Sequence, residues 1–187
     1  MEHPEDLTRW VAEHTADLTA AGAPPAQLTP STPPTPFTAD PAALSDVRAL
    51  RRAVRALFAH AVRPAPASPA DAHRLPTVDE ALAHLGAAAA RVPVVPELTW
   101  PEAGGPRLTY RPAAPAAPAD LLVSVLARAA AAFLAGDDRA RLRACHAPRC
   151  VRYFLKEHPR QEWCKPSCGN RARVARHQER RQEHHRA

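Results

Sequence analysis

The sequence contains few aromatic residues, few glycines and little lysine. Aromatic side chains make up 5% of the 187 residues, there are 6 glycines, and only Lys156 and Lys165 stand beside 23 arginines. Alanine supplies about half of the apolar residues, and proline is frequent, with 22 residues. Because such a chain has few large side chains to bury, we expect a thin core with irregular stretches between its elements. The excess of arginine over lysine, beside so much alanine and proline, indicates GC-rich coding rather than a function.

Two kinds of targeting segment are also missing. The opening residues, Met-Glu-His-Pro-Glu-Asp, are acidic and carry no apolar stretch, so they do not resemble a secretory signal. No apolar run approaches the ~18 residues that a membrane span requires. We therefore expect a cytoplasmic protein without a membrane partner. Thiols stay reduced in that compartment, where clustered cysteines favour a metal over disulfides.

Positive charge is concentrated in the last quarter of the chain. Residues 139–187 carry 14 basic and 4 acidic side chains, whereas residues 1–138 carry 11 basic and 15 acidic ones. A basic block confined to a short segment points to a polyanion as partner. The alternative is a basic tail that is merely solvated.

The N-terminal part has mainly helical patterns. Residues 5–21 carry apolar side chains at helical spacing, and a Pro-rich loop follows at 23–39, where proline forbids regular helix. The strongest helical pattern runs from Pro41 to Val62, with Asp40 as its N-cap. Its polar face, which we expect to be solvated or else to contact nucleic acid, carries Arg48, Arg51, Arg52 and Arg55.

Three more elements are predicted before the cysteines. A capping box at Thr77 starts a short helix. Residues 92–111 form a β-hairpin with a Gly-Gly turn, in which Trp100 and Tyr110 are placed to pair across the strands. Asp120 starts the last helix of this part. The predicted fold class is α+β, mainly α, with a helical N-terminal domain that contains one β-hairpin and a small C-terminal module.

All four cysteines fall within 24 residues of the C-terminal part. Cys145 and Cys150 are separated by four residues, 13 residues follow, and Cys164 and Cys168 are separated by three. Two close pairs joined by such a loop suit a tetrahedral metal site, because each pair supplies two thiolates from one turn. Nothing suggests electron transfer, so a single Zn²⁺ is favoured over an iron–sulfur cluster. The alternatives are two disulfides or unrelated free thiols.

Four thiolates complete the coordination shell of zinc, so the predicted site is structural and closed. Paired catalytic carboxylates, a nucleophile elbow and a phosphate-binding loop are not recognisable, and we expect no enzymatic activity. Metal binding should supply most of the folding free energy of so small a module, ~10 kcal/mol or more. We expect a mini-core around the metal, with base stacking by Tyr153 or Trp163 as the alternative, from Tyr153, Phe154, Leu155 and Trp163.

A basic helix is predicted after the last cysteine. Gly169 permits a tight turn out of the metal knuckle, and Asn170 is a suitable N-cap. One face of the helix then carries Arg173, Arg176, His177, Arg180 and His184. A helix N-terminus followed by a row of guanidinium groups suits phosphates and, in a major groove, guanine edges. The alternative is a helix that only keeps the protein soluble. The candidate nucleic-acid-binding residues are Arg171, Arg173, Arg176, His177, Arg180 and Arg181.

Three motifs in residues 139–181 carry a resemblance to a known family. They are Arg141-Leu142-Arg143, Trp163-Cys164 and the tetrapeptide Cys168-Gly169-Asn170-Arg171. Together they closely resemble the bacterial CGNR zinc-finger family, which is named after the tetrapeptide. The resemblance implies zinc ligation by all four cysteines and a DNA-binding role in transcription regulation.

The resemblance extends more weakly to the N-terminal part. Members usually carry an ABATE domain there, thought to belong to stress-induced regulators, and residues 40–135 are compatible with it. The family's opening strand, which ends in an Asn-Thr pair, is not recognisable, so we expect a truncated or diverged start. The family commonly has an Asp and a Ser after the aromatic pair and arginines before the Trp, whereas residues 156–162 read Lys-Glu-His-Pro-Arg-Gln-Glu here. We expect an ABATE-like helical domain at 1–138 and a CGNR-type zinc finger at 139–187.

These observations predict a zinc-binding, DNA-binding transcription regulator that joins the nucleoid when bound to DNA. We expect its N-terminal domain to form a homodimer or to sense a small-molecule effector. The alternative is a zinc-stabilised RNA-binding or protein-interaction module without sequence-specific DNA binding.

Overall fold

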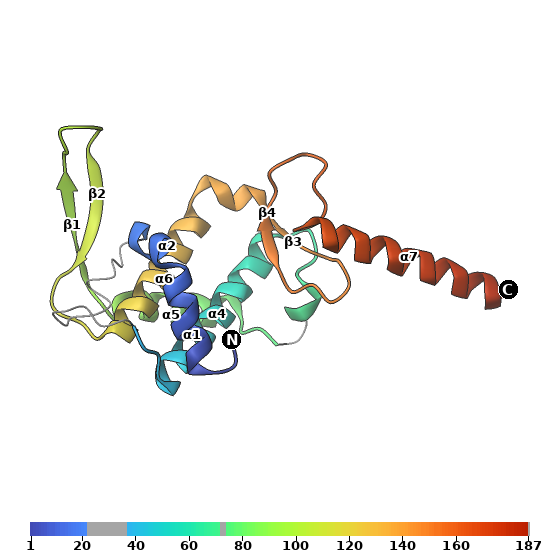
Figure 1. The fold of residues 1–187 in the computed structure, drawn as a ribbon, viewed down its shortest axis with the longest axis horizontal. Helices are drawn as coiled ribbons and strands as arrows, with labels where there is room; N and C mark the ends of the chain where they lie inside the picture. Colours follow the sequence, from blue (N-terminus) through green and yellow to red (C-terminus); the bar gives the residue numbers. More distant parts are fainter. Residues whose placement is uncertain (22–36, 72–73, 187) are drawn as a thin grey trace.

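The computed structural model describes residues 1–21, 37–71 and 74–186, which form a helical body and a small C-terminal module (Figure 1). The body consists of α1 (Pro4–Glu13), α2 (Thr15–Ala20), α4 (Pro41–Ala61), η1 (Pro69–Asp71), α5 (Val78–Ala90), β1 (Val94–Thr99), β2 (Arg107–Pro112) and α6 (Pro118–Ala135). The module consists of η2 (Asp137–Arg141), β3 (Leu142–Ala144), β4 (Tyr153–Leu155) and α7 (Pro166–Arg186). This arrangement confirms the predicted fold class. The predicted Pro-rich loop lies outside the described residues except at 37–39.

Side-chain caps fix the starts of two helices as predicted. The Asp40 carboxylate accepts a hydrogen bond from the Ala43 amide at 2.7 Å, directly before α4. Thr77 and Glu80 form a reciprocal capping box before α5. The first predicted helix is divided at His14 into α1 and α2. The capping residues therefore predict the starts of α4 and α5 correctly.

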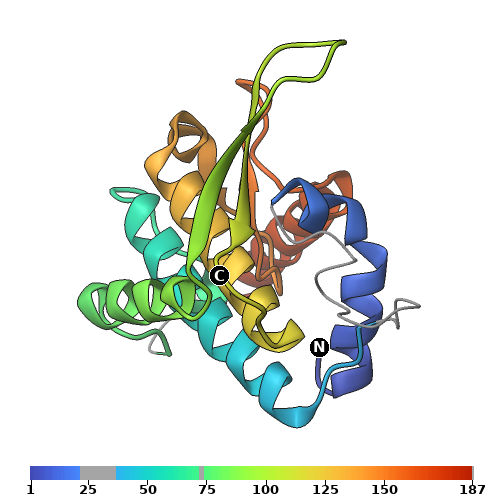
Figure 2. The ribbon, with the colours of Figure 1, turned by 90° about the vertical axis from the view of Figure 1, so that its left-hand side faces the viewer.

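The hydrophobic core lies where α4, α5 and α6 pack together, with α1 beside them. Leu7 of α1 and Leu122 and Val125 of α6 are fully buried, and Leu50 of α4 is 3% exposed. In Figure 2, α1 and α5 lie at opposite edges of this bundle. Much of the remaining core is alanine, namely Ala53 and six others. Small side chains let the helices approach closely, which is how a chain with few aromatic residues fills its interior.

Helix α6 is long and apolar enough to cross a membrane by length and composition, with a mean hydropathy of 1.6 over 18 residues. The expectation that no apolar run approaches this length is therefore wrong. In the structure, the helix packs against α4 and α5 and buries Leu121 and Leu122. Its Ser124 hydroxyl donates a hydrogen bond to the Ala89 carbonyl of α5 at 2.8 Å. The place of its first half in the core accounts for part of the apolar character of α6, since 33% of the 18-residue window is buried.

The predicted hairpin is present and projects from the body (Figures 1 and 2). Its antiparallel register sets Leu98 opposite Leu108 and Pro96 opposite Tyr110. Trp100 follows the end of β1 and is 74% exposed, so the expected pairing of Trp100 with Tyr110 is wrong. The connection between the strands is longer than the predicted Gly-Gly turn, so the pairing of β1 and β2 ends at Thr99 and Arg107.

A buried ion pair within the body forms hydrogen bonds to the C-terminal module. The Arg55 guanidinium donates to both carboxylate oxygens of Asp71 at 2.7 and 2.8 Å, and the two side chains are only 12% and 5% exposed. The Tyr153 hydroxyl donates to Asp71 Oδ2 at 2.7 Å, and Arg55 Nη1 donates to the Val151 carbonyl at 2.8 Å. The predicted solvation is therefore wrong for Arg55, because β4 covers this end of α4.

Aromatic packing supports the same junction. The rings of Phe58 and Tyr153 meet edge to face with centroids 5.6 Å apart, and Phe58 contacts Phe133 of α6 in the same way at 5.5 Å. Burial, followed by the hydrogen bond to Asp71, raises the pKa of Tyr153 to about 12. The phenol therefore stays protonated at neutral pH and remains a donor to the carboxylate.

We expect the Asp71→Ala variant to lose about 3 kcal/mol of unfolding free energy, because it leaves the buried Arg55 charge unpaired. The matched control is Asp46→Ala, which removes a carboxylate from the partly exposed pair with Arg91. That variant should lose about 0.5 kcal/mol, since Arg91 keeps Asp120 and solvent screens the pair. Urea denaturation of the zinc-loaded protein measures both values. Equal losses would show that the junction is no more important than a surface contact.

Candidate metal centre and nucleic-acid interface

The four cysteine side chains converge at one place in the C-terminal module. The sulfur of Cys164 lies 3.7 Å from that of Cys150 and 3.5 Å from that of Cys168, and the latter two are 3.8 Å apart. All four sulfurs lie within 4.8 Å of one another. A tetrahedral zinc site with Zn–S bonds near 2.3 Å has sulfur–sulfur edges of about 3.8 Å. Disulfide sulfurs would lie about 2.05 Å apart, so the spacing fits a metal and excludes disulfides in this structure.

Each cysteine pair is positioned by one tight turn. Between Cys145 and Cys150, the Cys150 amide donates to the Ala147 carbonyl, and the Cys145 amide donates to the Arg152 carbonyl, both at 2.9 Å. Arg149 closes this turn in the left-handed region, with φ of 60°. Cys168 lies in the first turn of α7, three residues after Lys165, whose carbonyl accepts from the Cys168 amide at 3.0 Å. The β3–β4 turn and the start of α7 thus face each other across the sulfur cluster.

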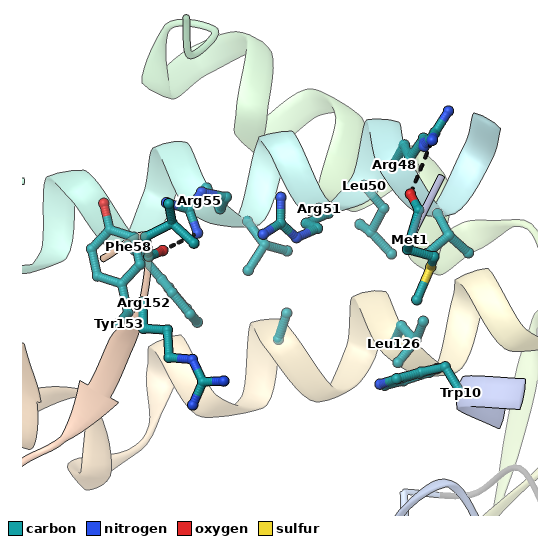
Figure 3. A pocket seen from close by; sticks show the side chains of 14 residues that line it. Met1, Trp10, Arg48, Leu50, Arg51, Arg55, Phe58, Leu126, Arg152 and Tyr153 are labelled. Atoms are coloured by element: carbon teal, nitrogen blue, oxygen red, sulfur yellow. Dashed lines mark hydrogen bonds between the residues drawn. The ribbon is translucent and has the colours of Figure 1, made fainter. Parts of the chain in front are cut away.

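Apolar side chains enclose the cluster on one side. Cys145 and Cys168 are fully buried, and Phe154 and Trp163 pack against them, as the predicted mini-core requires. Tyr153 and Leu155 do not join this mini-core, so their predicted places are wrong. Neighbouring residues of a strand point to opposite faces. Phe154 accordingly packs against the cysteines, while Tyr153 lies beside Phe58 of α4 (Figure 3).

The cluster needs positive charge around it. Burial, followed by hydrogen bonds with the neighbouring cysteines, raises the pKa of the Cys164 thiol, so a cation is required to hold it as a thiolate. Four thiolates around one Zn²⁺ carry a net charge of −2. The Arg171 guanidinium offsets part of this charge by donating to Cys168 Sγ at 3.1 Å. Arg171 therefore lies beside the sulfur ligands, where such donors orient and tune a metal site.

Helix α7 begins at Pro166, four residues before Asn170. The predicted turn at Gly169 and N-cap at Asn170 are therefore wrong, because proline at the first helical position already starts the helix. Gly169 matters for another reason, since a Cβ there would lie 3.0 Å from Cδ1 of Trp163. The missing side chain lets the indole lie against the helix. Asn170 accepts a hydrogen bond from Arg173 instead.

Beyond its first turns, α7 extends away from the body (Figure 1). Among its described side chains, which end at Gln182, only Cys168, Gly169 and Ala172 are buried. The exposed side chains include five of the predicted nucleic-acid-binding residues, namely Arg173, Arg176, His177, Arg180 and Arg181. The side chain of His184, the last member of the predicted stripe, lies outside the described residues. The helix therefore presents a basic, solvent-facing surface attached to the metal cluster.

Two family models match the chain. The ABATE model, described as "Putative stress-induced transcription regulator", matches residues 1–137. The chain belongs to the ABATE family. The CGNR zinc-finger model matches residues 141–181, so the resemblance is confirmed for both parts of the chain. A search of curated proteins finds no match. The ABATE family is described by transcription regulation and not by an enzymatic activity.

The contacts between the ABATE region and the CGNR zinc finger escaped sequence reasoning. Arg55 looked like one of four equivalent arginines on a helix face, and Asp71 falls in a proline-rich stretch with no helical or strand pattern. The available signal was the strand pattern around Tyr153 and Phe154, whose alternation already implies that one ring faces away from the metal.

Removing the metal should unfold the CGNR zinc finger and spare the α4–α6 core. We expect a strong chelator to collapse the amide NMR signals of residues 142–181, because the metal replaces a hydrophobic core there. The signals of α5, which packs on α4 and α6, should keep their positions. Re-adding Zn²⁺ is the control and should restore the original spectrum. A finger whose signals persist after complete metal removal would contradict a structural role for zinc.

Two glycine substitutions test the close approach of Trp163 to α7. Gly86 lies inside α5 with nothing within 4 Å of an added Cβ, so Gly86→Ala should raise the unfolding free energy by about 1 kcal/mol. Gly169→Ala has the same intrinsic helical advantage, but its Cβ would meet the indole. We expect no gain from Gly169→Ala in thermal or urea denaturation. Equal stabilisation by both changes would show that the Trp163 indole moves away from the added Cβ with no loss of unfolding free energy.

Proposed function

We propose that this protein is a DNA-binding transcription regulator whose CGNR zinc finger docks on duplex DNA through α7. In this proposal a single Zn²⁺ is held by Cys145, Cys150, Cys164 and Cys168. One observation carries the proposal: the sulfur cluster anchors the first turn of an exposed, arginine-rich helix. Membership of a transcription-regulator family supports it.

The contacts of α7 divide the arginines between two roles. Arg171 is engaged with Cys168 Sγ, and we assign it to the metal centre in addition to any contact with DNA. Arg173, Arg176, His177, Arg180 and Arg181 are the residues proposed to reach phosphates and base edges. Guanidinium groups suit both targets, because their planar donors bind phosphate oxygens or the O6 and N7 acceptors of guanine.

We further propose that residues 1–138 and 139–187 form the two domains, which the matched ranges 1–137 and 141–181 support. A regulator of transcription works where DNA is, so we place the protein in the cytoplasm and on the nucleoid. Homodimer formation by the ABATE domain stays a prediction that light scattering of the purified protein can check.

DNA docking can be measured by fluorescence anisotropy, after selection of bound sequences from random duplexes. If α7 reaches phosphates, affinity should fall steeply as salt rises. Arg176→Ala should weaken binding about tenfold and reduce the salt slope by about 1, because one phosphate contact is lost. Arg160→Ala is the matched control, since Arg160 is exposed on the finger but lies outside α7. It should bind nearly as well as the unchanged protein.

Three outcomes would sink the proposal. Binding without salt dependence would favour a protein-interaction module. Tighter binding to single-stranded RNA than to every selected duplex would favour an RNA-binding module. Equal losses from Arg160→Ala and Arg176→Ala would show that α7 is not the contact surface.

A further inference from the structure

A cavity of about 740 Å³ lies between the ABATE region and the CGNR zinc finger (Figure 3). Its long walls are α4 and α6, and Trp10 of α1 lies at one end with Met1. At the other end lie Arg152 and Tyr153 of the finger. Both parts of the chain therefore contribute side chains to one cavity, which is partly open to solvent.

The lining combines an apolar surface with a single sign of charge. Apolar side chains along the cavity include those of Val47, Val54, Phe58 and Leu126. All ionisable side chains in the lining besides Tyr153 are arginines, and the lining contains no carboxylate side chain. These arginines are Arg48, Arg51, Arg55 and Arg152. Such a lining suits a ligand with an apolar body and a negative group, because pockets of this size bind by apolar contact and orient by a few polar groups.

Two of the four arginines already have partners. Arg48 donates to the main-chain carbonyls of Met1 and Glu2, both at 2.9 Å, and Arg55 is paired with Asp71. Within the described part of the chain, the guanidinium groups of Arg51 and Arg152 form no hydrogen bond or ion pair. Partial burial, followed by the nearby charge of Arg55, lowers the pKa of Arg51. An anion placed beside Arg51 would relieve that cost.

We propose that this cavity binds an amphipathic carboxylate, with its apolar body between α4 and α6 and its carboxylate received by Arg51 and Arg152. Guanidinium forks bind carboxylates in a bidentate manner, and the exposed side chains of Arg51 and Arg152 are accessible to an incoming carboxylate. A nucleic-acid backbone suits the cavity less well, because it carries repeated charges and has no apolar surface to place against the apolar walls. An occupant would contact Arg51 on α4 and Arg152 on the finger, and would therefore bridge the two parts of the chain. Any effect of this occupant on DNA docking rests on the proposed function. The binding of the carboxylate in the cavity does not.

Isothermal titration calorimetry of the zinc-loaded, full-length protein tests the site. The probes are octanoate and 2-naphthoate, with octan-1-ol and octyltrimethylammonium as neutral and cationic matches of the first. We expect saturable binding of the carboxylates at one site and much weaker binding of the two matches. Arg51→Gln and Arg152→Gln should each weaken carboxylate binding about tenfold, because each removes a charge-assisted hydrogen bond.

Arg52→Gln and Arg160→Gln are the matched controls, since both side chains are exposed like those of Arg51 and Arg152 but lie outside the cavity lining. Neither should change carboxylate binding. Ala130→Phe provides a test without a charge change, because Ala130 lines the cavity on α6 and a larger ring there occupies its space. This variant should abolish carboxylate binding while its ligand-free melting temperature shows that it is folded. If it does not fold, the two arginine variants still decide the proposal.

The inference fails if neither carboxylate binds saturably, if the cationic match binds equally well, or if the control variants lose as much affinity as Arg51→Gln. It also fails if Arg51→Gln impairs duplex binding but leaves carboxylate binding unchanged, which would assign the arginine to nucleic acid. The DNA assay is separate from these titrations. Carboxylate binding in a protein that binds no duplex would keep the site and overturn the proposed function, and the reverse result would do the opposite.

Discussion

The spacing of four sulfurs around one point is the constraint on which the C-terminal part of this protein depends. Apart from cysteines, the buried residues of that part are almost all small, namely Leu142, Ala144, Ala147 and Ala172. Its two strands have three residues each, too few to be stable without further support. A metal ion that joins the β3–β4 turn to the start of α7 supplies the missing cohesion, and it also sets where the helix begins and which way it points.

A second constraint positions the finger against the helical body. The Arg55–Asp71 pair is nearly buried, and such pairs stabilise little when compared with apolar packing of the same volume. Their geometry is nevertheless demanding, because every donor and acceptor must find its partner. Tyr153 and the Val151 carbonyl complete that set from the finger side. The pair therefore specifies one arrangement of the two parts and leaves the adjoining cavity with a defined shape.

Local signals made part of this structure readable from the sequence. The caps at Asp40 and Thr77, the apolar stripe of α4 and the two cysteine pairs each occupy a few neighbouring residues, so their consequences could be derived directly. Pro166 is an equally local signal, and it rather than Asn170 sets the start of α7. Local signals therefore do not decide a helix start when two of them lie within one turn.

Other features depend on residues far apart in the chain. Asp71 lies 16 residues from Arg55 and 82 from Tyr153, and nothing in the sequence connects them. The cavity is formed by three helices and a strand, so its lining is known only once they are packed. The apolar sequence of α6 is a local signal, but its length and composition fit a membrane span as well as a protein core. Only its contacts with α4 and α5 distinguish the two environments.

The exposure of α7 has a mechanical consequence. Among the side chains of this 21-residue helix that the structure describes, which end at Gln182, the buried ones all lie in the first two turns, and the 14 residues after Ala172 extend for about 20 Å. That outer part behaves as a rigid arm, since a continuous helix has no hinge. If the four cysteines hold a metal ion, its coordination sets the direction of α7 relative to the body, because Cys168 lies in the first turn of the helix. A change in the arrangement of the four cysteines would therefore change the angle at which the outer part of α7 leaves the body.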